Sequence, residues 1–84
     1  MAVVLVTREA QAQFESLPIV IQTRVEKVYQ RLERWPEVSG ARALAGDLAG
    51  RWRIRTGDYR LQFHVAGDVV TVEKVGHRDG FYGE

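Results

Sequence analysis

The chain has 84 residues, no cysteine and a formal net charge of +1, so its overall charge indicates no particular partner. This length suffices for one domain, residues 1–84, and 45% hydrophobic residues predict a packed core rather than a disordered chain. Without cysteine, disulfides, thiol catalysis and cysteine metal sites are excluded, and two histidines leave few metal ligands. We therefore expect no cofactor and no metal. Residues 1–6 are too short for a signal peptide and no run is long enough to span a membrane, so we expect a cytoplasmic protein.

The first half of the chain predicts one strand followed by two helices. Residues 3–6 form a short apolar run, which we interpret as a strand buried on both faces. Thr7 is a typical helix N-cap, and the helix after it is interrupted before Pro18. From residue 19 to residue 35 apolar side chains recur at helical spacing, and Pro36 ends this helix. The two helices predict a hairpin that buries its apolar stripe against a sheet.

The second half predicts three antiparallel strands. Residues 41–50 are ambiguous, and we expect a loop with a short turn or a strand fragment. Residues 51–56 and 59–65 alternate apolar and polar side chains on either side of a Gly-Asp turn, and a second Gly-Asp turn leads into residues 69–75. In this register Phe63 faces Val72, and Val75 falls on the polar face. The fold class is therefore α+β, an N-terminal strand, a two-helix hairpin and a three-stranded meander, with the helices on one face and a free basic groove on the other.

Arginines gather on the polar face of the predicted hairpin. Arg51, Arg53 and Arg55 alternate along its first strand, and a two-residue turn places Arg55 directly opposite Arg60. Like charges opposed across a ladder are destabilising, so this arrangement favours an anionic ligand, and guanidinium groups suit bidentate contact with phosphate. The alternative is an ordinary solvated face, and Asp47 and Glu73 are the carboxylates that could neutralise the arginines.

Several motifs resemble the RelE/ParE superfamily of toxins from toxin–antitoxin systems, over essentially the whole chain. They are the element order, the Gly-Asp-Tyr-Arg turn at residues 57–60, and a terminal His77-Arg78 followed by Tyr82. The resemblance implies a toxin held inactive by a cognate antitoxin protein. RelE-like members cut mRNA on the ribosome by attack of the 2′-hydroxyl on the adjacent phosphate, which leaves a 2′,3′-cyclic phosphate and a 5′-hydroxyl. ParE-like members inhibit DNA gyrase and are not nucleases.

The resemblance also implies which residues form the site. The family's basic pair falls on Arg53 and Arg55, its turn arginine on Arg60, its terminal arginine on Arg78 and its terminal tyrosine on Tyr82. We expect Arg55, Arg60 and Arg78 to clamp a phosphate, with Arg53 secondary and Tyr82 positioning the substrate.

Proton transfer is harder to place, because an arginine pKa lies far above neutrality. His77 is the only group of the tail that titrates near neutral pH, so His77 or Arg78 is the candidate acid or base. The presence of the arginines and Tyr82 favours a metal-independent endoribonuclease. A gyrase inhibitor, or a degenerate member that binds only an antitoxin, remains the alternative.

Overall fold

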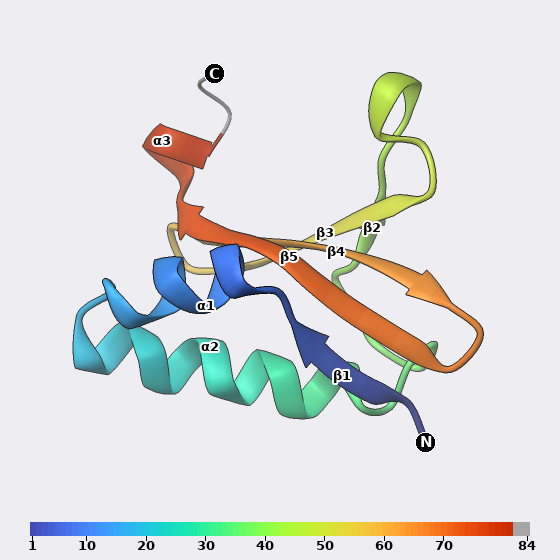
Figure 1. The fold of residues 1–84 in the computed structure, drawn as a ribbon, viewed down its shortest axis with the longest axis horizontal. Coiled ribbons are helices and arrows are strands. Elements are labelled where there is room, and N and C mark those ends of the chain that lie inside the picture. Colours follow the sequence, from blue (N-terminus) through green and yellow to red (C-terminus); the bar gives the residue numbers. More distant parts are fainter. Residues whose placement is uncertain (82–84) are drawn as a thin grey trace.

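The computed structural model describes residues 1–81, and Figure 1 shows two helices packed beneath one face of a five-stranded sheet. The strand order is β1-β5-β4-β3-β2, in which β1 runs parallel to β5 and the other neighbours are antiparallel. This arrangement confirms the predicted α+β fold. Strands β1 and β2 form the two edges of the sheet. In chain order the elements are β1 (Val3–Val6), α1 (Arg8–Glu15), α2 (Ile19–Leu32), β2 (Arg42–Ala43), the 3-10 helix η1 (Gly46–Leu48), β3 (Arg51–Thr56), β4 (Tyr59–Ala66), β5 (Val69–His77) and α3 (Arg78–Phe81).

Local signals set the limits of the two long helices. The hydroxyl of Thr7 accepts a hydrogen bond from the Ala10 amide at 3.1 Å, which confirms the predicted N-cap of α1. The prediction that α2 continues to Trp35 was wrong, because the helix ends at Leu32. The amide of Trp35 instead bonds the carbonyl of Leu32 three residues back, since the residue before a proline is disfavoured in helical geometry.

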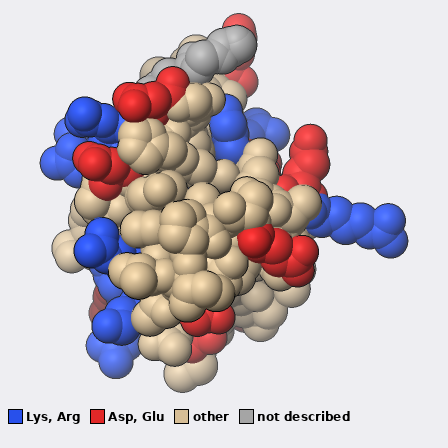
Figure 2. All heavy atoms as spheres, turned by 90° about the vertical axis from the view of Figure 1, so that its left-hand side faces the viewer, with Lys and Arg blue, Asp and Glu red and all other residues tan. Residues whose placement is uncertain are grey.

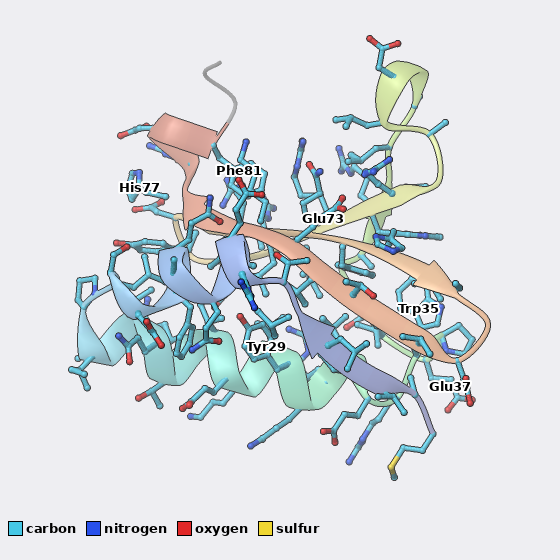
Figure 3. The ribbon with its side chains drawn as sticks, viewed as in Figure 1. Tyr29, Trp35, Glu37, Glu73, His77 and Phe81 are labelled. Atoms are coloured by element: carbon cyan, nitrogen blue, oxygen red, sulfur yellow. The ribbon has the colours of Figure 1, made fainter. Side chains whose placement is uncertain are left out.

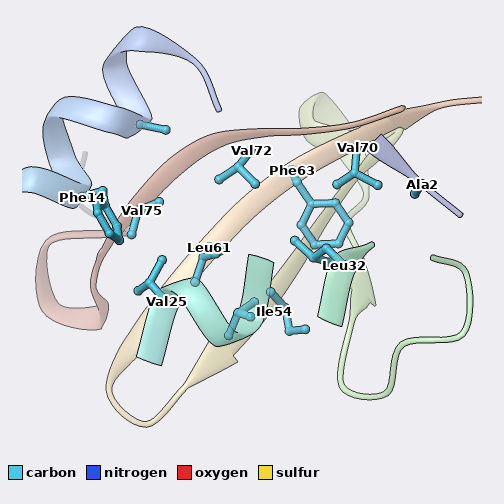
Figure 4. Packing of buried hydrophobic residues seen from close by; sticks show 12 residues of the cluster. Ala2, Phe14, Val25, Leu32, Ile54, Leu61, Phe63, Val70, Val72 and Val75 are labelled. Atoms are coloured by element: carbon cyan, nitrogen blue, oxygen red, sulfur yellow. The ribbon is translucent and has the colours of Figure 1, made fainter. Parts of the chain in front are cut away.

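The core lies between α2 and the sheet. The buried side chains of α2 face apolar residues from three strands, and the ring of Phe63 packs close to Leu32 (Figure 4). These buried sheet residues are Ile54, Leu61, Phe63, Val70, Val72 and Val75. The helical hairpin therefore covers one face of the sheet, as its apolar stripe predicts.

The first strand is an edge strand with one exposed side. Val3 and Leu5 are 52% and 50% exposed, so the prediction that this run is buried on both faces was wrong. The physical reason is that successive side chains of a strand point to opposite faces of the sheet. Val4 and Val6 pack against the core, whereas no described element covers Val3 and Leu5 on the other face.

A β-bulge changes which side of β5 faces the core. Phe63 pairs with Val72 as predicted, but Gln62 pairs with Lys74, so Glu73 is an extra residue in β5. Beyond the bulge the alternation is reversed, and Val75 pairs with Leu61 and is 2% exposed. The prediction that Val75 lies on the polar face was therefore wrong.

The polar face is also less open than expected. Helix α3 turns back over it, and the ring of Phe81 is 3% exposed (Figure 3). The Arg53 guanidinium carbon lies 5.3 Å from the centre of this ring and the Lys74 ammonium nitrogen 4.5 Å from it. An aromatic residue of the tail thus covers part of the face that we expected to be free.

Candidate functional site

Four arginines from three neighbouring strands share one face of the sheet. The predicted register of the β3–β4 hairpin is confirmed, and Arg55 stands directly opposite Arg60. On the other side of β3, Arg42 of β2 stands directly opposite Arg53. Two opposed pairs of like charge are unfavourable in a sheet by itself, so their proximity points to a site for anions.

These arginines line a hollow of about 420 Å³, which we call the arginine hollow. It is lined by Arg31, Gly40, Arg42, Leu44, Arg53, Ile54, Arg55 and Arg60, and no carboxylate belongs to this set. Its volume is more than ten times the roughly 30 Å³ that a water molecule occupies, so a phosphate group fits.

Backbone carbonyls hold two of these side chains in place. Nη1 of Arg60 donates to the carbonyl oxygens of Gly57 and Tyr59 at 2.9 and 3.2 Å, which ties the side chain to the hairpin turn. Nη2 of Arg31 donates to the carbonyl oxygen of Ser39 at 2.7 Å. Fixed guanidinium groups lose less conformational entropy when they bind an anion.

The sequence interpretation missed Arg31 and Arg42. Arg42 lies in the segment left ambiguous, and only its pairing with β3 places it beside Arg53. Arg31 lies off the apolar stripe of α2, where a solvated role is the usual expectation. The sequence signal for Arg42 was weak: it lies in residues 41–50, a segment that could add one more strand beside the hairpin.

Arg51 belongs to a separate, neutralised group. Its Nε donates to Oε1 of Glu73 at 2.6 Å, and Gln62 and His64 also bond this carboxylate. Burial alone raises the pKa of Glu73, but the Gln62 hydrogen bond, the hydrogen bond and charge of Arg51, and the His64 hydrogen bond together hold the pKa below its ordinary value. Glu73 therefore neutralises Arg51, as one of the sequence alternatives proposed.

The tail residues are not gathered around the hollow. His77 pairs with Tyr59, and the two rings meet edge to face with centroids 5.1 Å apart. Since Tyr59 alternates with Arg60, His77 lies on the face opposite the arginines, and Figure 3 shows it at the outer end of β5, away from Glu73. The amide of Arg78 donates to the carbonyl of Asp58 at 2.8 Å, so Arg78 stands beside the hairpin turn.

The side chain of Arg78 has two acidic neighbours there. Its Nε lies 4.0 Å from Oδ1 of Asp58 and 3.7 Å from Oδ1 of Asp79, and the side chain is 56% exposed. Tyr82, predicted to position the substrate, lies outside the described residues. Of the six predicted site residues, the structure therefore brings Arg53, Arg55 and Arg60 into one hollow, with Arg78 at the adjoining turn.

The hollow is suited to stabilising charge rather than moving protons. Its charged groups are guanidiniums, which stay protonated at any physiological pH.

Within the described residues no three His, Asp or Glu side chains are close enough to hold a metal ion, and no helix is long and apolar enough to cross a membrane. Figure 2 shows several Lys and Arg side chains along the left margin of that view and others near the top and on the right, with acidic side chains among them.

Comparison with known proteins identifies the family. Residues 4–80 match the family described as ParE toxin of type II toxin-antitoxin system, parDE. The chain belongs to the RelE/ParE superfamily of type II toxins. The resemblance inferred from the sequence is thereby confirmed. No curated protein matches this toxin.

Solved structures show the same fold. The toxin–antitoxin complex RelBE2 from Mycobacterium tuberculosis contains a chain with a TM-score of 0.81 and 25% identity, and the match covers 92% of this chain and 98% of that one. The isolated RelE toxin of E. coli has a TM-score of 0.76 at 17% identity, covering 92% and 84%. The RelE–RelB complex of Pyrococcus horikoshii has a TM-score of 0.73 at 23% identity, covering 92% and 94%. The matching family is thus ParE, whereas these solved relatives are RelE or RelBE proteins.

Proposed function

We propose that this toxin is a ribosome-dependent mRNA endoribonuclease whose arginine hollow binds the phosphate that is attacked. The observation that carries the proposal is the grouping of Arg42, Arg53, Arg55 and Arg60 on one face, with no carboxylate among the described residues that line the hollow. In the proposed reaction the 2′-oxygen forms a bond to phosphorus and the bond to the 5′-oxygen breaks. Negative charge grows on the phosphoryl oxygens during this exchange, and guanidinium groups stabilise it.

The residues of the site account for phosphate binding in the proposed reaction but not for proton transfer. Arg55 and Arg60 form the centre of the proposed clamp, with Arg53 beside them, and Arg78 is the member that stands outside the hollow, at the adjoining turn. His77 is turned toward Tyr59, so its position gives no support to a role beside the clamp. Proton transfer to the leaving 5′-oxygen, and from the 2′-hydroxyl, then falls to the end of the tail or to groups of the ribosome.

A cognate antitoxin is the partner that the relatives suggest. Structures of RelE with RelB antitoxin are known from Methanococcus jannaschii, Pyrococcus horikoshii and E. coli, and each shares the fold of this chain. We therefore propose that this toxin is also bound by an antitoxin in the cell.

A gyrase inhibitor is the second candidate, and two observations favour it. The matching family is that of ParE, and the arginine hollow contains no group that titrates near neutral pH. In this alternative the same arginines bind an acidic surface and no bond is broken.

Substitution in the hollow separates the two candidates. We expect Arg55→Ala to lower mRNA cleavage by about 10²–10³-fold, the usual effect of removing one group that stabilises transition-state charge. The measurement is mapping of mRNA 5′ ends, together with plasmid supercoiling, after induced expression without antitoxin. Arg8→Ala on the exposed start of α1 is the control and leaves cleavage unchanged.

The outcome has two alternatives. Intact mRNA with loss of negative supercoiling contradicts the endoribonuclease and supports the gyrase inhibitor. Cleavage that is equal in the Arg55→Ala and Arg8→Ala proteins contradicts the assignment of the arginine hollow.

A further inference from the structure

The arginine hollow shares a lining residue, Arg31, with a second basic hollow beside α2. This α2 hollow, also about 420 Å³, is lined by Lys27, Gln30, Arg31, Arg34, Glu37, Val38 and Ser39. The guanidinium of Arg31 donates to the carbonyl oxygen of Ser39 at 2.7 Å, three residues before β2 begins. The two hollows are therefore neighbours, with one fixed arginine common to both.

Two cations of α2 and one just after its end line this second hollow. Lys27 and Arg31 are four residues apart and occupy the same side of the helix. The amide of Arg34 bonds the carbonyl of Arg31 at 3.0 Å, so the chain keeps turning and Arg34 stays beside them. Of the residues in 1–81 that line this hollow, Glu37 is the one carboxylate against three cations, which leaves the α2 hollow positively charged.

We infer that Lys27, Arg31 and Arg34 extend the arginine hollow into a path that binds the phosphate backbone of single-stranded RNA to one side of the bond that is cut. This inference rests on the proposed endoribonuclease function and adds where the substrate strand leaves the site. Successive cations along a groove match the repeated phosphates of one nucleic acid strand.

Among residues 1–81 no aromatic side chain lines either hollow, so this part of the lining offers neither an anchor pocket for a peptide nor a stacking platform for bases. The feature that matches an RNA strand is the row of cations, because the phosphates of RNA repeat at every nucleotide. Contacts to phosphate alone carry no sequence information. The path therefore contributes affinity for the strand without a preference for its bases.

Binding of RNA of two lengths by the full chain tests the path. We compare a double variant, Lys27→Gln with Arg34→Gln, with the control variant Arg8→Glu. Both lower the net charge by two units, but Arg8 lies outside both hollows. The probes are labelled single-stranded RNAs of about four and about twelve nucleotides, within the range of known single-strand site sizes. The readout is fluorescence anisotropy at several salt concentrations, without ribosomes.

The double variant should bind the longer RNA about tenfold more weakly, because two contacts to phosphate are lost. Each lost contact should also make the plot of log affinity against log salt less steep by about 0.7. The affinity of the double variant for the shorter RNA should be unchanged, and Arg8→Glu should alter neither. An equal loss in Arg8→Glu, or no loss in the double variant, overturns the path alone. Polyglutamate serves as a second probe, for an acidic protein partner. If the double variant loses binding to polyglutamate while its RNA binding is unchanged, the surface belongs to a protein partner and the RNA path is overturned. A chain that binds neither RNA also overturns the path alone, whereas mRNA that stays intact in the induced cells overturns the proposed function itself.

Discussion

Glu73 decides how much of the arginine face is available to a ligand. Its carboxylate accepts hydrogen bonds from Arg51 and Gln62 and is bonded to His64, so Arg51 is neutralised inside the fold. The arginine hollow contains no such carboxylate among its lining residues. One acidic side chain thus divides a row of arginines into a structural part and a part suited to binding.

The lowered pKa of Glu73 predicts a pH dependence of stability. A carboxyl group whose pKa is lower in the folded chain stabilises the fold above its unfolded pKa of about 4.3, and this contribution is lost as the pH falls through the folded value. We expect Glu73→Gln to lower the melting temperature at pH 7 and to bring it close to that of the unchanged chain at pH 3. Thermal unfolding followed by circular dichroism between pH 3 and 7 measures the difference. A difference that stays constant over this range contradicts the role of the charge.

At the level of single residues, the sequence predicted only part of the site. The opposition of Arg55 and Arg60 followed from a two-residue turn and strict alternation, and the structure confirms it. The contact between Glu73 and Arg51 depends on a bulge that no residue pattern marks. The place of Phe81 depends on how a short terminal helix folds back, which alternation does not determine.

Among the elements, α3 has one buried side chain, that of Phe81, and the ammonium of Lys74 also donates to the Phe81 carbonyl oxygen. A helix of four residues is not stable by itself, so burial of the Phe81 ring against the sheet holds it in place. The amide of Arg78 is held at the same end through the carbonyl of Asp58. The position of Arg78 in the proposed clamp therefore depends on a contact made three residues later.

Phe81→Ala should release α3 without unfolding the sheet. We expect faster hydrogen exchange of the Arg78 amide and a loss of stability below the about 3–5 kcal/mol typical of a core Phe→Ala substitution, because the opening is local. Phe81→Leu is the control and should keep most of the protection, since it retains an apolar side chain. Unchanged exchange at Arg78 in Phe81→Ala would show that α3 is held by other contacts.

The elements with explicit turn signals were the predictable ones. Gly57 and Gly67 have φ values of +58° and +60°, which residues with a side chain rarely adopt, and each Gly-Asp pair gave a hairpin at the expected place. Strand β2 has only two residues, too few for a period to be recognised. The parallel pairing of β1 with β5 joins distant parts of the chain, so local patterns do not reveal it.

At the scale of the whole molecule, stability depends on the layer between α2 and the sheet. Val25 is fully buried in this layer, whereas Val20 on the same helix is 66% exposed. The two residues have the same helix propensity, so they form a matched pair in which only burial differs.

Val25→Ala should therefore lower the free energy of unfolding by about 2 kcal/mol, from the lost burial of two methyl groups and the cavity that remains. Val20→Ala should change it by less than about 0.5 kcal/mol, as is usual for exposed positions. Urea denaturation of both variants gives the comparison. Equal effects would contradict the assignment of α2 as the helix that covers the core.

The shortness of β2 has a consequence for solubility. β2 pairs with β3 only at Trp52 and Arg53, and no strand of the described chain pairs with the outer edge of β3 from Ile54 to Thr56. Open strand edges invite pairing with the same edge of another molecule, and charged side chains on them oppose such association. Arg55, which we assign to phosphate binding, lies on this open edge and therefore also opposes aggregation. A substitution that removes its charge to abolish activity will at the same time remove that protection.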